Sequence, residues 1–94
     1  MGRRFVVVAY DIPDDRRRER LHDLLLNYGT PVQYSVFECL VDEGEWKGLR
    51  RAVRRVIKKR LDHVRYYTLC RACQKRIEVT GGREVAHEPE VIVV

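Results

Sequence analysis

The sequence has few of the residues on which several large classes of protein depend. It contains 3 cysteines, 3 prolines and 1 tryptophan among 94 residues. A small, odd number of cysteines argues against a disulfide framework and for a reducing compartment. No apolar run approaches the roughly 20 residues of a membrane-spanning helix, and the first apolar run is too short for a secretion signal. We therefore expect a cytoplasmic protein that does not associate with membranes.

The chain also lacks internal repeats, low-complexity tracts and linker-like stretches. We therefore expect residues 1–94 to form a single domain. The apolar content of 45% argues against disorder. A chain of this length nevertheless buries only about two-thirds of its unfolded surface, so contact with a second subunit would stabilise it. We expect a homodimer on these grounds.

Acidic residues are the smaller charged group, with 14 Asp plus Glu against 19 Lys plus Arg and a net charge of +5. Most of the basic residues are arginine. The guanidinium fork matches phosphate oxygens in two-point contacts, which the lysine ammonium does not. The composition therefore makes nucleic acid the first partner to consider, with surface ion-pair networks as the alternative.

The first half of the chain predicts a strand, a helix and a β-rich segment. The apolar run at 4–10 (RFVVVAY) is typical of a strand buried on both faces at the centre of a sheet. Acidic residues and a proline then precede a periodic stretch that a glycine ends, which predicts a helix with Leu21 and Leu25 on its core face. The β-forming residues at 30–41 predict either one bent strand or a hairpin that folds near Tyr34.

The second half predicts another helix and further strands. Apolar residues recur at helical spacing over 46–61, while 63–70 and 76–80 are rich in β-formers. The apolar residues at 91–94 are expected to add a strand to a sheet edge, that of the partner subunit. This order predicts an α+β fold, a ferredoxin-like split βαβ sandwich (βαββαβ) with an extra C-terminal strand.

Asp11 directly follows the predicted central strand and precedes a helix. Ligands of α/β sheets gather at such strand ends, and a carboxylate there could hold a hard cation such as Mg²⁺. Helix capping is the alternative role for this segment. One carboxylate is a poor metal site, but Asp11 from each subunit of a dimer could face one ion across a twofold axis. Such an ion stabilises the charge that builds on a scissile phosphate.

Two clusters of basic residues predict contact with a nucleic-acid backbone. The first opens the first helix, where Arg17 or Arg18 should lean back toward Asp11, with salt bridges within the helix as the alternative. The second covers the outer face of the second helix, which has no acidic residue after Glu45. Backbone contacts of this kind are blind to sequence and weaken steeply with salt. The residues expected to bind nucleic acid are Arg16, Arg17, Arg50, Arg51, Arg54, Arg55, Lys58 and Lys59.

The three cysteines are expected to pack as ordinary side chains rather than to bind a metal or take part in redox reactions. Cys39 lies in an apolar run and should pack as a small apolar residue. Cys70 and Cys73 form a CxxC pair, but a zinc site would need two further ligands, and the histidines lie at no recognised spacing. We therefore favour ordinary cysteines at the end of a strand over zinc or redox chemistry.

Two stretches together resemble a known protein family. The first, FVVVAYDIPDDRRRERLHDLLLNYG, combines an apolar strand ending in Tyr10-Asp11, an acidic pair, arginines in the first helix and a leucine-rich face. The second, VQYSVFECLV, follows it directly. In this order, and in a chain of this length and charge, they resemble the small CRISPR-associated adaptation endonuclease, the second core CRISPR protein family.

The resemblance implies a ferredoxin-like homodimer that partners the CRISPR integrase in spacer acquisition. It also implies an endonuclease that uses magnesium, or another divalent cation, to cleave single-stranded RNA or double-stranded DNA. The family's metal-binding aspartate falls on Asp11, shared with Asp11 of the partner subunit. The positions that the resemblance implicates in cleavage are Asp11, Tyr10, Arg18, Arg20, Ser35 and Phe37.

A non-catalytic scaffold is the alternative from a different functional class. In that interpretation the basic helices bind duplex DNA, the dimer bridges integrase subunits, and Asp11 only caps a helix. The sequence leaves RNA and DNA open as substrates, because a site directed at the backbone contacts phosphate in both.

Overall fold

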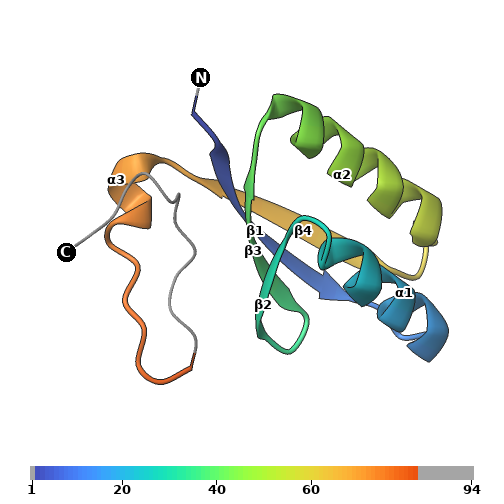
Figure 1. The fold of residues 1–94 in the computed structure, drawn as a ribbon. Helices are drawn as coiled ribbons and strands as arrows, with labels where there is room; N and C mark the ends of the chain where they lie inside the picture. Colours follow the sequence, from blue (N-terminus) through green and yellow to red (C-terminus); the bar gives the residue numbers. More distant parts are fainter. Residues whose placement is uncertain (1, 83–94) are drawn as a thin grey trace.

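The first strand lies at the centre of a four-stranded antiparallel sheet of order β2-β3-β1-β4 (Figure 1). The computed structural model describes residues 2–82. In chain order the elements are β1 (Arg4–Asp11), α1 (Asp15–Leu25), β2 (Gly29–Gln33), β3 (Val36–Val41), α2 (Glu43–Val56), β4 (His63–Leu69) and α3 (Arg71–Gln74). The predicted central position of the first strand is confirmed.

The sheet is built from two interleaved βαβ units. β1 runs antiparallel to β3, and β3 runs antiparallel to β2, so β1 and β2 are parallel with β3 between them. In the same way, β3 and β4 are parallel on either side of β1. α1 and α2 make the two connections and cover one face of the sheet (Figure 1). The predicted ferredoxin-like βαββαβ order is confirmed.

The segment at 30–41 is a hairpin, which settles the choice between a hairpin and one bent strand. β2 and β3 are joined by a turn at Tyr34 and Ser35, and Ser35 has a φ of 64°. Gly29 allows the two strands to approach, because a Cβ atom there would lie 2.3 Å from the carbonyl oxygen of Glu38. The turn contains no glycine, so the usual sequence signal for a hairpin is missing.

Asp14 caps α1 by accepting a hydrogen bond from the backbone N–H of Arg17 at 2.9 Å. The helix buries Leu21 and Leu25 against the sheet, as predicted. The cap belongs to Asp14 and leaves the nearby Asp11 carboxylate with no part in it.

α2 is shifted toward the N-terminus relative to its prediction. It begins at Glu43 because Asp42 and Glu45 form a reciprocal capping box. It ends at Val56, so the predicted end at residue 61 is wrong. The buried carboxylate of Asp62 accepts a hydrogen bond from the backbone N–H of Lys58 at 2.8 Å, which turns the chain away from the helix.

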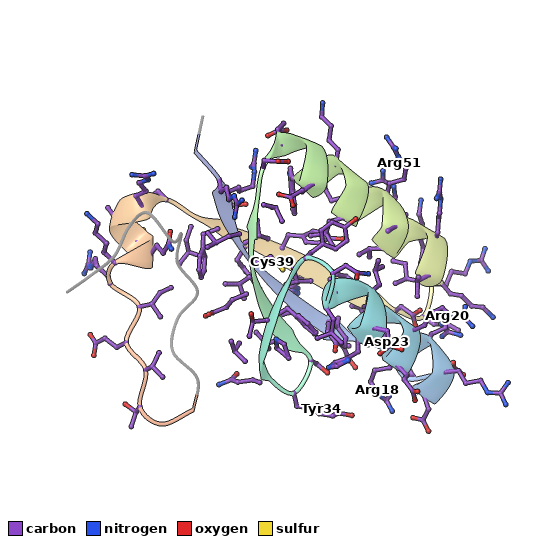
Figure 2. All side chains as sticks on the ribbon, viewed as in Figure 1. Arg18, Arg20, Asp23, Tyr34, Cys39 and Arg51 are labelled. Atoms are coloured by element: carbon purple, nitrogen blue, oxygen red, sulfur yellow. The ribbon has the colours of Figure 1, made fainter. Side chains whose placement is uncertain are left out.

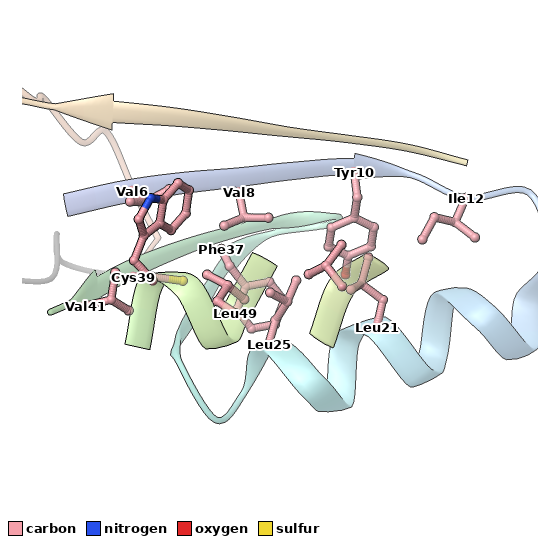
Figure 3. Packing of buried hydrophobic residues seen from close by; sticks show 12 residues of the cluster. Val6, Val8, Tyr10, Ile12, Leu21, Leu25, Phe37, Cys39, Val41 and Leu49 are labelled. Atoms are coloured by element: carbon pink, nitrogen blue, oxygen red, sulfur yellow. The ribbon is translucent and has the colours of Figure 1, made fainter. Parts of the chain in front are cut away.

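The hydrophobic core lies between the sheet and the two long helices (Figure 3). Alternate residues of β1 point into it, and Trp46, Leu49 and Val53 reach it from α2. Cys39 is fully buried there, which confirms its predicted apolar role. The other face of β1 is covered less well, because Val7 and Ala9 are only half-buried. Complete burial of this strand on both faces, as predicted, therefore does not hold for one chain.

The segment after β4 differs from its prediction. Residues 76–80 form no strand, and the short helix α3 precedes them instead. α3 lies beyond one end of the sheet, away from the start of α1 (Figure 1). The strand predicted at 91–94 lies outside the described residues. Within residues 2–82, no helix has both the length and the apolar character needed to cross a bilayer.

Candidate active site

Asp11 is the last residue of β1 and is exposed. Its neighbour across the sheet is His63, the first residue of β4. Because successive side chains of a strand point to opposite faces, Asp11 lies on the open face of the sheet and Tyr10 on the helix-covered face. No other described residue forms a hydrogen bond or ion pair with the Asp11 carboxylate. Its acceptor oxygens are available to a ligand.

A cleft of about 450 Å³ opens on the helix-covered side of the same strand end. It lies between the outer side of α1 and the β2–β3 turn. Three residues predicted from the family resemblance, Tyr10, Arg18 and Ser35, share this cleft although they come from three different elements. The other residues that line it are Asp15, Glu19, His22, Gln33 and Tyr34.

Aromatic rings form the inner wall of the cleft. Phe37 is fully buried beneath it, with its ring centroid 6.4 Å from that of Tyr10 and 5.2 Å from that of His22. The backbone N–H of Tyr10 donates to the carbonyl of Ser35 at 3.0 Å, which fixes the turn against the end of β1. Burial raises the pKa of the Tyr10 hydroxyl, although nearby Arg18 acts in the opposite direction. Tyr10 and His22 therefore line the cleft, whereas Phe37 lies buried beneath them.

Arg18 joins the cleft to the end of β1. Its Nη1 donates to the carbonyl oxygen of Ile12 at 2.8 Å, one residue beyond Asp11. Its Nη2 pairs with the carboxylate of Asp15. The hydrogen bond with Asp15 raises the pKa of Arg18, so the Arg18 guanidinium stays protonated. Of the two arginines expected to lean back over the strand end near Asp11, Arg18 contacts the carbonyl of Ile12, the residue after Asp11.

Arg17 makes a different contact. Its Nε and Nη2 donate to the two carboxylate oxygens of Asp62 at 2.7 and 2.9 Å. The pairing holds the pKa of Asp62 below its usual range, chiefly through the Arg17 hydrogen bond. Only 13% of the Arg17 side chain is exposed. The structure thus assigns Arg17 to the connection between α1 and the loop before β4.

Arg20 lies outside the cleft. In Figure 2, Arg18 and Tyr34 lie close together, whereas Arg20 lies on the side of α1 nearer the end of α2. Residues two apart in a helix point to different faces, which explains the separation. Arg16 is also exposed on α1. The structure therefore groups Tyr10, Arg18 and Ser35 in the cleft and leaves Asp11 and Arg20 outside it.

The exposed surface of α2 and of the turn after it carries a set of basic residues. None of these residues forms an ion pair with a carboxylate in the described part of the chain. The exposed positions are Lys47, Arg51, Arg54 and Arg55 on the helix, with Lys58, Lys59 and Arg60 in the following turn. This set is the basic surface. Arg51 marks it in Figure 2.

Arg50 departs from the predicted outer face of this helix. It is half-buried, with its guanidinium carbon 4.7 Å from the centroid of the Trp46 ring. The two residues are four apart and therefore share one side of α2. Such stacking stabilises a guanidinium over an aromatic face. Arg50 therefore contributes to packing around Trp46 as well as to the positive charge of the helix.

His22 and Tyr34 line the cleft, but neither was predicted as a site residue. Asp15, Arg18 and His22 are spaced by three and four residues, so they share one face of α1. That spacing was the signal available for His22. Tyr34 is 84% exposed because it occupies the hairpin turn, whose position the sequence left open.

A single copy of the chain does not form a metal centre within the part that the structure describes. Across residues 2–82, no three His, Cys, Asp or Glu side chains gather closely enough to hold an ion. Asp11 supplies hard oxygen ligands of the kind that magnesium prefers, and magnesium binds through as few as one or two carboxylates. The donor chemistry fits a metal site that is completed by a second copy.

Comparisons with known proteins identify the family. A sequence model described as "CRISPR associated protein Cas2" matches residues 4–77. A CRISPR-associated endonuclease Cas2 of Thermus thermophilus is 47% identical over 94 residues, which is 100% of both chains. A CRISPR-associated endoribonuclease Cas2 of Synechocystis is 38% identical over 88 residues, covering 94% of this chain and 96% of the relative.

A solved structure supports the same assignment. A chain of a partial Cas6-RT-Cas1–Cas2 complex superposes with a TM-score of 0.76 and 28% identity, covering 97% of this chain and 99% of that one. The fold and family predicted from the sequence are therefore confirmed, and the relatives carry the names of nucleases. The chain belongs to the Cas2 family of CRISPR-associated proteins.

Proposed function

We propose that this chain is a divalent-metal-dependent endonuclease of CRISPR adaptation that cleaves phosphodiester bonds as a cytoplasmic homodimer. The observation that carries the proposal is the Asp11 carboxylate, which is exposed at the end of the central strand while Asp14 serves as the helix cap. Relatives of this chain are named endonuclease and endoribonuclease, so cleavage of a phosphodiester bond is the reaction in which the carboxylate would take part.

Two copies meeting through the open face of the sheet would bring their Asp11 residues together. This face presents half-buried Val7, Ala9 and Leu40 beside exposed Tyr67. Burying apolar surface of this kind stabilises a subunit interface. Asp11 lies at the edge of the same face, next to His63. A twofold axis near this edge would set Asp11 opposite Asp11 of the partner subunit.

The paired Asp11 carboxylates are the residues that hold the metal in this proposal. Magnesium suits them because it binds one or two carboxylates and completes its shell with water and phosphate oxygens. When bound, the ion stabilises the negative charge developing on the scissile phosphate and lowers the pKa of an attacking water. A carboxamide at position 11 would keep the shape of the side chain and lose the charge that attracts the cation.

The remaining site residues orient the nucleic acid. Arg18 is held by Ile12 and Asp15 beside the strand end, where its positive charge can bind a phosphate. Ser35 and Tyr10 line the cleft, and the buried Phe37 ring lies near that of Tyr10. Arg20, on the adjacent surface of α1, provides a further phosphate contact.

The basic surface binds the backbone at a distance from the cleavage site. Phosphate contacts position a nucleic acid without reading its sequence, and each contact releases counterions. We therefore propose that RNA and DNA both bind, and that strandedness and the 2′-hydroxyl act only near the cleft. Of the residues predicted to bind nucleic acid, Arg51, Arg54, Arg55, Lys58 and Lys59 belong to the basic surface. Arg16 and Arg50 add charge beside it, whereas Arg17 is committed to Asp62.

The test is a cleavage assay on matched single- and double-stranded RNA and DNA, with magnesium and with a chelator. Wild-type protein should cleave at least one substrate only with the metal. Asp11→Asn should lower that rate by about 100-fold or more, because it removes the metal ligand. Glu78→Gln changes an exposed carboxylate beyond α3 and outside the cleft, and should keep the wild-type rate. Equal rates for wild type and Asp11→Asn would refute the site.

A second function, a non-catalytic scaffold, is favoured by one observation. The solved chain that superposes on this one comes from a complex whose name includes Cas1. The match covers 99% of that solved chain. We propose that the dimer also bridges integrase subunits and holds duplex DNA through the basic surface. Binding of duplex DNA and co-purification with integrase, without cleavage at any metal concentration, would support the scaffold function alone.

A further inference from the structure

Cys70 and Cys73 form a thiol pair that the nuclease proposal does not use. Cys70 directly follows β4 and is the N-cap residue of α3, and Cys73 lies three residues on, within the helix. Both are exposed and carry free thiols. Among residues 2–82, no third acidic, histidine or cysteine side chain joins them in a metal-binding group.

The two cysteines lie close together and are not equivalent. The Sγ of Cys70 accepts a hydrogen bond from the backbone N–H of Cys73 at 3.4 Å. Side chains three apart on a helix are neighbours with Cβ atoms about 5–6 Å apart, so formation of a disulfide requires the two Cβ atoms to approach by about 1–2 Å.

These contacts separate the acidities of the two thiols. The Cys73 backbone hydrogen bond stabilises the thiolate of Cys70 and lowers its pKa. The pKa of Cys73 is raised, first because its own thiol donates a hydrogen bond to Cys70. The thiolate is the nucleophilic form of cysteine. Cys70 is therefore suited to attack first, and Cys73 to resolve the product.

We propose that Cys70 and Cys73 are a redox-active dithiol that exchanges with an anionic low-molecular-weight disulfide, of which oxidised glutathione is the probe. Arg71, Lys75 and Arg76 surround the pair in the sequence and place positive charge next to the thiols. That charge favours the approach of an anionic disulfide over a neutral one. The absence of further metal ligands from the described cluster favours exchange over zinc.

The exchange consumes the two thiols of Cys70 and Cys73 and one small disulfide, and its atoms and electrons balance. The Cys70 thiolate attacks one sulfur of the small disulfide, whose S–S bond breaks and releases one thiolate. Cys73 then loses its proton and attacks the Cys70 sulfur, which releases the second thiolate. Two electrons pass to the small disulfide, and the two protons of Cys70 and Cys73 end on the two released thiols. The protein retains a Cys70–Cys73 disulfide.

This site is independent of the cleavage site. Cys70 follows Leu69, which pairs with Phe5 near the start of β1, whereas Asp11 ends that strand. The intervening length of strand is roughly 20 Å at about 3.4 Å per residue. Figure 1 shows α3 beyond the sheet end opposite to the start of α1. Cleavage by the oxidised and reduced proteins is therefore expected to be equal, and failure of the nuclease proposal would leave this one standing.

The test equilibrates the reduced, full-length protein with mixtures of reduced and oxidised glutathione, followed by acid quenching, alkylation and peptide mass spectrometry. An internal Cys70–Cys73 disulfide should form and should reverse fully with dithiothreitol. Cys39 is an internal control, because burial raises the pKa of its thiol to about 11 and it should react only after unfolding. Separate glutathione adducts on both cysteines without an internal disulfide would overturn the proposal.

Single variants test the order of attack. Cys73→Ser keeps the backbone N–H that supports Cys70, and should accumulate a mixed disulfide on Cys70. Cys70→Ser should react several-fold more slowly at Cys73. Equal rates in the two variants would contradict the assigned roles. Stoichiometric zinc binding to the reduced protein that is lost in either variant, and that blocks the exchange, would make this a metal site instead and overturn the redox proposal.

Discussion

Arg17 and Asp62 form a two-point ion pair that ties the first turn of α1 to the loop before β4. Asp62 is the only buried charged residue in the described part of the chain, at 4% exposure. Its carboxylate also accepts the backbone N–H of Lys58, so both oxygens are engaged. The pair connects parts of the chain 45 residues apart, directly beside the strand end that carries Asp11.

Removing one member of this pair should destabilise the fold. Arg17→Ala leaves the Asp62 carboxylate buried without its counter-charge. Asp62→Ala leaves the backbone N–H of Lys58 without its hydrogen-bond acceptor. We expect Asp62→Ala to lower the free energy of unfolding by about 3 kcal/mol. The double variant Arg17→Ala/Asp62→Ala should lose less than the sum of the two single variants. Urea unfolding measures all three, and strictly additive losses would contradict the coupling.

Acidification should weaken the same connection. The pKa of Asp62 is lowered by Arg17 in the folded protein, so the unfolded chain takes up a proton first as the pH falls. The stability from this group is therefore complete above the ordinary carboxyl pKa of about 4 and is lost below it. Between neutral pH and a pH of about 3, the melting temperature of the wild type should fall more than that of Arg17→Met/Asp62→Leu, a double variant that lacks the ion pair. Parallel curves would contradict this assignment.

The sequence predicted most of the fold because its signals are local. The apolar run of β1 and the punctuation around α1 do not depend on distant residues. The end of α2 does depend on one, since Asp62 is buried by Arg17 from another helix. The turn at Ser35 was also hidden, because a serine in the left-handed region has no glycine signal.

The same distinction applies to the site. Asp11 could be proposed from the sequence because it ends an apolar strand, and Arg18 because it lies within reach on the next helix. The inclusion of Tyr34 and His22 in one cleft needs the hairpin and α1 to be packed together. That arrangement is tertiary, so periodicity alone does not reveal it.

Tyr34 should stack on a base of the bound nucleic acid. It is 84% exposed at the rim of the cleft, where its ring supports no core packing. Aromatic stacking contributes about 1–3 kcal/mol per base, so Tyr34→Ala should weaken single-strand binding by about tenfold. Tyr34→Phe keeps the ring and should bind normally. Fluorescence anisotropy measures both, and melting temperatures should be unchanged. Normal binding by Tyr34→Ala would exclude stacking at this residue.

The basic surface should set the salt dependence of duplex binding. Replacing Arg51, Arg54 and Arg55 with glutamine removes three exposed charges of α2. The slope of log affinity against log salt should become shallower by about 0.9 for each duplex phosphate that is no longer neutralised. The matched control replaces Arg71, Lys75 and Arg76, which lie at the other end of the sheet around α3. An equal change in both triple variants would show that net charge alone is responsible.

The most direct test of the account is the activity of a mixed dimer. Wild-type and Asp11→Ala chains carrying different affinity tags are co-expressed, and the species with one chain of each kind is purified. If the two Asp11 carboxylates share one metal, the mixed dimer should cleave as slowly as the Asp11→Ala homodimer. A mixed dimer that retains half the wild-type rate would show that each Asp11 acts alone, and would contradict the shared site.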